Sequence, residues 1–167
     1  GACKELVTVL FAKGIQNIAY LGSNMDQMVN RCRYQGYEEA YRKGKRKLNQ
    51  DLVYTDLSSK AMVEKAVEEL KKSGVECILC QDDYICDEAV RKLSHMGVRI
   101  PDQMKVASCH YSRILENYPV TVTSLKFNIT ELGRRSCQVL LDMIHGKTVP
   151  DKTLLDYEII LKESTKG

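Results

Sequence analysis

Apolar residues recur along the chain at two different spacings. Positions three and four residues apart predict amphipathic helices, and short continuous apolar runs predict buried strands. Helical spacing covers residues 3–11, 28–40, 62–70, 85–93 and 132–143, and strand-like runs cover residues 17–21, 52–54, 75–80, 105–109, 120–125 and 157–161. Helices and strands that alternate in this way favour right-handed βαβ units. We therefore expect a three-layer αβα fold, in which helices cover both faces of Rossmann-like parallel sheets.

Composition narrows the class of protein without naming a function. The 167 residues are 44% hydrophobic and 28% charged, which is typical of a globular protein with one core or two small lobes. No apolar run approaches the roughly 20 residues that cross a bilayer, so no membrane partner is predicted. The net charge of +3 is too small to predict a nucleic-acid partner by itself.

The cysteines indicate a reducing compartment. There are seven, and their spacing is not that of a disulfide framework, so we expect free thiols and a cytoplasmic location. Cys77 and Cys80 form a CxxC motif inside a predicted strand, where residues three apart face opposite ways. They should not share a metal or a redox bridge, and we predict neither a metal site nor a cofactor.

Four polar segments follow predicted strands. In open parallel sheets, ligands bind outside the carboxyl ends of the strands. The segments are Gly22-Ser23-Asn24, Thr55-Asp56-Leu57, Gln81-Asp82-Asp83-Tyr84 and His110-Tyr111. The sequence contains no GxGxxG, Walker or GxSxG motif, so nucleotide-binding and hydrolase functions lose their main support.

Three charged residues in or near these segments could bind a ligand, and each has a structural alternative. Asp82 and Asp83 precede a predicted helix, where they can serve as N-cap and first-turn acid; Asp82 is the better placed to accept from a ligand. Arg33 interrupts an apolar helical stripe, so its guanidinium must be paired or reach a polar cavity. Its five donors suit a carboxylate or several sugar hydroxyls, but on the residues alone a structural ion pair is favoured.

Two further patterns have a simple structural interpretation. Cys109 and His110 suggest a nucleophile pair, but neighbours on a strand face opposite ways, so thiol and imidazole should not meet. We predict no catalytic residue. The basic run at residues 42–47 follows a helix and favours a solvated C-terminal turn, with contact to DNA phosphates as the alternative.

Read in order, seven stretches resemble the effector-binding core of the lactose/galactose-repressor (LacI) family. They are residues 14–22, RYQGY at 33–37, DDYI at 82–85, GVRIPD at 97–102, VTSL at 122–125, LG at 132–133 and LKEST at 161–165. Each is weak alone, but the ordered set spans nearly the whole chain. The family shares its fold with periplasmic sugar-binding proteins. The resemblance implies two lobes with an effector between them, whose closure alters the operator affinity of an N-terminal helix-turn-helix.

The resemblance also implies roles for single residues. By matching position, Arg33 is expected to grip the effector and Asp82 to reach it. Leu57 occupies a site often held by an aromatic that stacks on a sugar ring, and Phe127 lies in a crossover segment that lines the cleft. Asn24, at the end of the first strand, completes this effector-binding set together with His110.

The chain departs from the family at two of these positions. The family usually carries an aspartate pair where this chain has His110-Tyr111, and Leu57 offers no stacking face. Both differences put a simple hexose effector in doubt. An acidic, phosphorylated or less polar ligand fits as well, with His110 and Arg33 as donors.

The resemblance divides the chain between two lobes. Residues 1–43 with 122–146 are expected in an incomplete lobe nearer the DNA, and residues 46–118 with 149–167 in the distal lobe. It implies a sugar-like effector, DNA contact only through a preceding helix-turn-helix domain, and a homodimer. The alternatives are a solute-binding protein of the same fold and a Rossmann-like enzyme that uses Asp82, His110 or Cys109.

Overall fold

The computed structural model describes residues 1–166, which are built around one mixed sheet. Within these residues the sheet has six strands, in the order β2-β1-β3-β4-β5-β6. Their bounds are β1 Ile18–Leu21, β2 Val53–Tyr54, β3 Cys77–Cys80, β4 Lys105–Ser108, β5 Thr123–Phe127 and β6 Tyr157–Ile160. The first five are parallel, and β6 runs antiparallel to β5.

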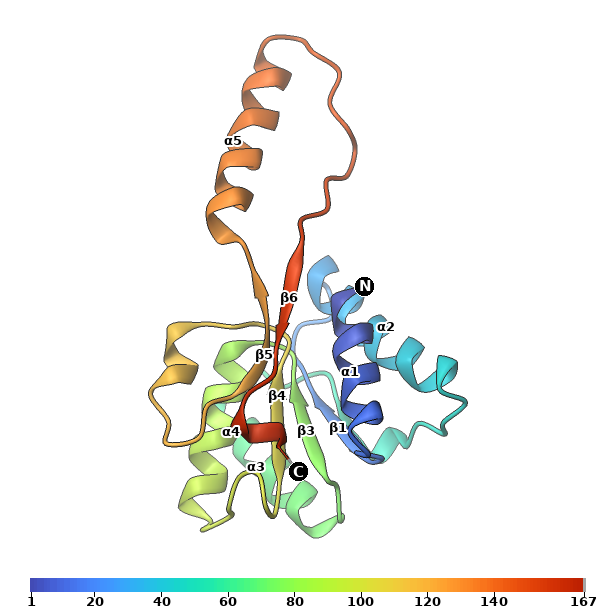
Figure 1. Ribbon diagram of the computed structural model, residues 1–167, viewed down its shortest axis with the longest axis vertical. Coiled ribbons are helices and arrows are strands. Elements are labelled where there is room, and N and C mark those ends of the chain that lie inside the picture. The colour runs from blue at the N-terminus through green and yellow to red at the C-terminus, as the bar shows by residue number, and fades with distance from the viewer. Residues whose placement is uncertain (167) are drawn as a thin grey trace.

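Helices cover both faces of the sheet and complete three layers (Figure 1). Helices α1 (Ala2–Ala12) and α2 (Met28–Lys43) pack on one face, while α3 (Lys60–Lys72) and α4 (Asp83–His95) pack on the other. Short 3₁₀ turns lie at Gln50–Leu52, Arg113–Glu116 and Glu163–Thr165. The predicted three-layer α/β fold is confirmed. No helix of residues 1–166 has the length and apolar character required to span a bilayer.

The central strands are buried on both faces, as their continuous apolar runs predict. In β3, Cys77 and Leu79 join the core beneath α1 and α2, whereas Ile78 and Cys80 join the core beneath α3 and α4. The prediction that the two cysteines of the CxxC motif face opposite ways is therefore confirmed.

The C-terminal turn is attached to the sheet by buried hydroxyl groups. Ser164 Oγ donates to the carbonyl of Val106 at 2.6 Å and accepts from the amide of Thr123 at 2.9 Å. Thr165 Oγ1 lies 2.7 Å from Thr123 Oγ1, and both side chains are fully buried. The EST sequence thereby bridges β4 and β5 where these two strands begin to pair.

Helix α5 (Ile129–Ile144) stands away from this body (Figure 1). None of its residues is buried, although it is strongly amphipathic. The chain returns to the sheet through residues 145–156 and β6. Apolar side chains along this projection are half or more exposed: Ile129, Leu132, Leu140, Met143, Ile144 and Leu154.

The sheet corrects the expected division into lobes. Strand β1 belongs to residues 1–43, yet it is hydrogen-bonded between β2 and β3, which belong to residues 46–118. A strand paired on both sides cannot leave its sheet, so residues 1–43 and 46–118 form one unit. The segment that leaves this unit is residues 129–156.

Candidate functional site

Several of the polar segments named from the sequence meet at one edge of the sheet. The last residues of β1, β3 and β4 stand in register, with Leu21 beside Cys80 and Cys80 beside Ser108. The segments that follow are residues 22–24, 81–83 and 109–111, which we call the carboxyl edge. Parallel strands place ligands at this position, so it is the candidate site.

A buried amide joins the first two segments of the carboxyl edge. Gln81 is fully buried, and its Oε1 accepts from the Ser23 amide at 3.2 Å and from the Tyr20 hydroxyl at 3.4 Å. A Cβ on Gly22 would lie only 2.7 Å from the same oxygen, so a glycine is required there. Sequence reasoning included Gln81 in a segment but missed its role; the signal was a polar residue directly after a buried strand.

The two aspartates take the N-cap and first-turn positions that the sequence offers as their structural roles, and contact of Asp82 with an effector stays a prediction. Asp82 is the N-cap of α4, because its Oδ1 accepts from the amide of Ile85 at 2.9 Å. Asp83, at the first position of the helix, places Oδ1 3.3 Å from Nδ1 of His110. Burial raises the pKa of Asp83, but the Ser112 hydroxyl and the His110 imidazole lower it more, so its pKa lies below the usual value.

His110 and Cys109 point in different directions, as expected. The Cys109 thiol is buried under α1, with its sulfur 3.5 Å from that of Cys3. Hydrogen bonding to Cys109 and burial hold the pKa of the Cys3 thiol well above its ordinary value, which is typical of an unreactive thiol. His110 turns instead toward Asp83 and stays partly exposed.

Arg33 lies half-buried on α2 near the end of β1. Burial is the largest effect on Tyr20 and raises its pKa, while the charge of Arg33 acts on the same hydroxyl in the opposite direction. Among residues 1–166 no carboxylate forms an ion pair with Arg33. The structural ion pair favoured from the residues alone is therefore not what the structure shows. The guanidinium remains available to a ligand.

Leu57 does not belong to the site. It is 5% exposed and packs into the core beneath α3 and α4, while its amide donates to the carbonyl of Gly22 at 3.0 Å. Its side chain therefore fills the core, and the expected contact with an effector is corrected. The apolar residue after Thr55-Asp56 is explained by packing.

Asn24 ends the first segment of the carboxyl edge, and Phe127 ends β5. Asn24 is exposed with a φ of 39°, a conformation asparagine tolerates, and its carbonyl accepts from the side chain of Asn30 at 3.0 Å. Phe127 packs beside Tyr157 and lines an open cavity of about 640 Å³, together with Tyr111 and Lys126. This volume is in the range of small-molecule sites. The cavity lies where α5 leaves the sheet, and Tyr111, the last residue of the carboxyl edge, is one of its lining residues.

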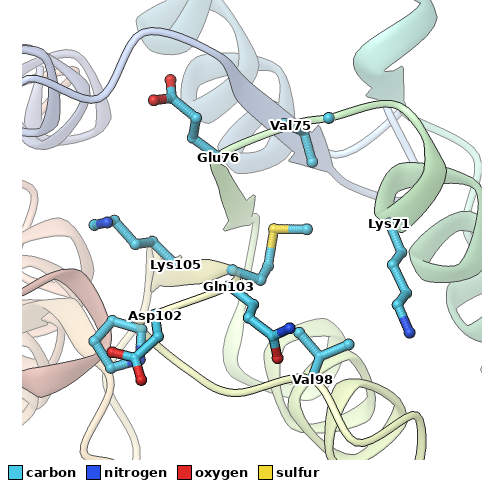
Figure 2. Close-up of a pocket in the computed structure, with 10 residues that line it drawn as sticks. Lys71, Val75, Glu76, Val98, Asp102, Gln103 and Lys105 are labelled. Atoms are coloured by element: carbon cyan, nitrogen blue, oxygen red, sulfur yellow. The ribbon is translucent and has the colours of Figure 1, made fainter.

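A second cavity lies at the opposite edge of the sheet (Figure 2). It measures about 450 Å³ and is lined by residues before β3 and at the start of β4, among them Glu76, Gln103 and Lys105. Figure 2 shows Lys71 reaching it from α3. The amino ends of parallel strands do not form the usual ligand crevice, so this cavity is not the candidate site. Among residues 1–166, no group of three or more His, Cys, Asp or Glu side chains could hold a metal ion.

Fold and site together define an open, mostly parallel α/β lobe with a polar carboxyl edge, the architecture of a ligand-binding lobe. The chain belongs to the periplasmic binding protein-like domain family, which it matches over residues 7–165.

The chain resembles regulators in both sequence and structure. It is 26% identical to the HTH-type transcriptional regulator CelR of Thermobifida fusca, over 98% of this chain and 49% of that protein. It is 26% identical to the HTH-type transcriptional regulator GntR of Escherichia coli K12, over 92% of this chain and 46% of that protein. The chain therefore spans about half the length of the curated relatives it matches.

Two solved structures show the same fold. The transcription regulator CcpA of Lactococcus lactis superposes with a TM-score of 0.90 at 23% identity, covering 99% of this chain and 61% of that one. A complex of the transcriptional regulator CelR with cellobiose gives 0.87 at 26% identity, covering 98% and 51%. These relatives are LacI-type transcriptional regulators, not enzymes, which argues against the Rossmann-like enzyme.

Proposed function

We propose that this chain is the effector-binding part of a DNA-binding transcriptional repressor of the LacI type. It binds a small sugar-like metabolite at the carboxyl edge and couples that binding to operator affinity. The observation that carries this proposal is Arg33, a half-buried guanidinium without a carboxylate partner among residues 1–166, set at the ligand edge of this fold. A half-buried guanidinium without a carboxylate partner can form hydrogen bonds with a ligand.

The cellobiose complex of CelR supports a sugar-like effector. Related chains named as HTH-type regulators support DNA contact through a helix-turn-helix domain elsewhere in the protein. A homodimer and a cytoplasmic location are part of the same proposal.

We also propose that residues 129–156 belong to a second lobe and that residues 1–128 with 157–166 form the distal lobe. The support is α5, none of whose apolar side chains is buried in the described residues although its pattern is that of a packed helix. On this division β5 and β6 lead into and out of the second lobe. The cavity lined by Phe127 then lies at the crossing point, where closure of two lobes would enclose a ligand.

A thermal-shift screen of sugars on the full natural protein tests the effector. A sugar present at a hundred times its dissociation constant should stabilise the protein by about 2.7 kcal/mol. Arg33→Ala should abolish the stabilisation because it removes the principal donor. Arg42→Ala, an exposed arginine on the same helix, is the matched control and should keep it. An unchanged stabilisation in Arg33→Ala would refute the assigned site.

A further inference from the structure

His110, which stands where the resemblance leads us to expect an aspartate, is held at two points. The hydroxyl of Ser108, fully buried at the end of β4, donates to the carbonyl of His110 at 2.8 Å and accepts from its amide at 3.2 Å. These two bonds orient the backbone of His110. The imidazole is held separately, through Nδ1, by the carboxylate of Asp83 at 3.3 Å.

This second contact decides where the imidazole proton lies. An ionised carboxylate has no proton to donate and can only accept, so the Nδ1 of His110 must carry the hydrogen. In the neutral ring the lone pair then resides on Nε2. The imidazole side chain is 30% exposed, and no protein group of residues 1–166 pairs with Nε2.

We propose that Asp83 is a positioning residue that fixes His110 in the Nδ1–H tautomer, so that His110 Nε2 accepts a hydrogen bond from an effector hydroxyl. The inference rests on the proposed function for the effector, but the tautomer itself does not. It means that histidine supplies the acceptor that the family's aspartate supplies. The effector class is then a neutral, hydroxyl-rich molecule, which removes the doubt that His110 raises from the sequence alone.

The same geometry predicts that the site distinguishes neutral effectors from anionic ones. A carboxylate or phosphate at this position would face the Nε2 lone pair, whereas a hydroxyl would donate to it. Among residues 1–166, the side chain that makes a polar contact with the ring is that of Asp83.

Imidazole NMR tests the positioning role without any ligand. The full natural protein is labelled with ¹⁵N-histidine, and His110→Gln assigns the His110 signals. At pH 8 the wild-type spectrum should show His110 as the Nδ1–H tautomer. Asp83→Ala should shift it toward the Nε2–H tautomer that free imidazole favours, while Asp83→Glu, which keeps an acceptor-only carboxylate, should restore it. His95 and His145 are internal controls, and their spectra should not change. The proposal would be overturned if the wild-type spectrum shows His110 as the Nε2–H tautomer, or if Asp83→Ala leaves the tautomer of His110 unchanged.

A binding measurement tests the acceptor role. Glucose, galactose and cellobiose are compared with their 6-phosphates at pH 8 by calorimetry. Each neutral sugar should bind about tenfold more tightly than its 6-phosphate, a difference that corresponds to about one hydrogen bond. His110→Gln should reduce this ratio of affinities. Tighter binding of the phosphorylated member would overturn the acceptor role. Failure of all six compounds to bind would overturn the sugar effector of the proposed function, and the NMR spectrum would still decide the role of Asp83.

Discussion

The hydroxyl of Ser164 is small, but it satisfies two backbone groups between β4 and β5. It donates to the Val106 carbonyl at 2.6 Å and accepts from the Thr123 amide at 2.9 Å, and the side chain is fully buried. Ser164→Ala removes both bonds and leaves a buried carbonyl and a buried amide without partners. Each lost bond costs about 1 kcal/mol, and each buried group left unsatisfied costs up to about 3 kcal/mol. We expect the free energy of unfolding to fall by about 2–6 kcal/mol.

Urea-induced unfolding, followed by circular dichroism, measures this change. The midpoint should move to lower urea while the slope stays constant, because the variant exposes the same surface on unfolding. Ser94→Ala is the matched control: Ser94 is exposed near the end of α4, and its loss should change stability by less than about 0.5 kcal/mol. If Ser164→Ala costs no more than this control, the two hydrogen bonds do not hold the C-terminal turn, and the argument fails.

Three further predictions follow from other parts of the chain. Gly22→Ala would place a Cβ 2.6 Å from the Tyr20 ring and 2.7 Å from Gln81 Oε1, so it should lower the unfolding free energy by about 1–3 kcal/mol in the same urea assay; a neutral effect would show that the edge can relax. The pKa of Asp83 is lowered in the folded state, so its contribution is present above its unfolded pKa and is lost as the pH falls through the folded one; stability measured from pH 5 to pH 2 should fall less steeply in Asp83→Asn, and a steeper fall would contradict the assignment. Amides of α5 should exchange with deuterium rapidly in the 167-residue chain, because none of its residues is buried, and slowly in the full natural protein; equal rates would refute the proposed second lobe.

Local pattern was sufficient for several features of the site. Strand periodicity correctly separated Cys77 from Cys80 and Cys109 from His110, because side chains alternate along a strand whatever its neighbours are. The rule for parallel sheets also placed the polar segments at one edge, since that rule depends only on strand direction.

Other assignments depended on contacts between distant segments. Asp82 and Asp83 are adjacent and chemically identical, so their roles were decided by which carboxylate meets the Ile85 amide and which meets His110, 27 residues away. Leu57 became a core residue because α3 and α4 cover it. Arg33 has no ion-pair partner among residues 1–166, a fact that spacing along α2 does not contain.

By itself, the sequence determined the order of helices and strands, the three-layer fold and the edge where a ligand would lie, because periodicity and strand direction are local properties of the chain. The tertiary structure alone decided that β1 sits between β2 and β3, that α5 departs from the body, and that Asp83 orients His110. Those features depend on pairings across tens of residues. The free energy of such pairings comes from burial and hydrogen bonds formed only when the distant segments meet.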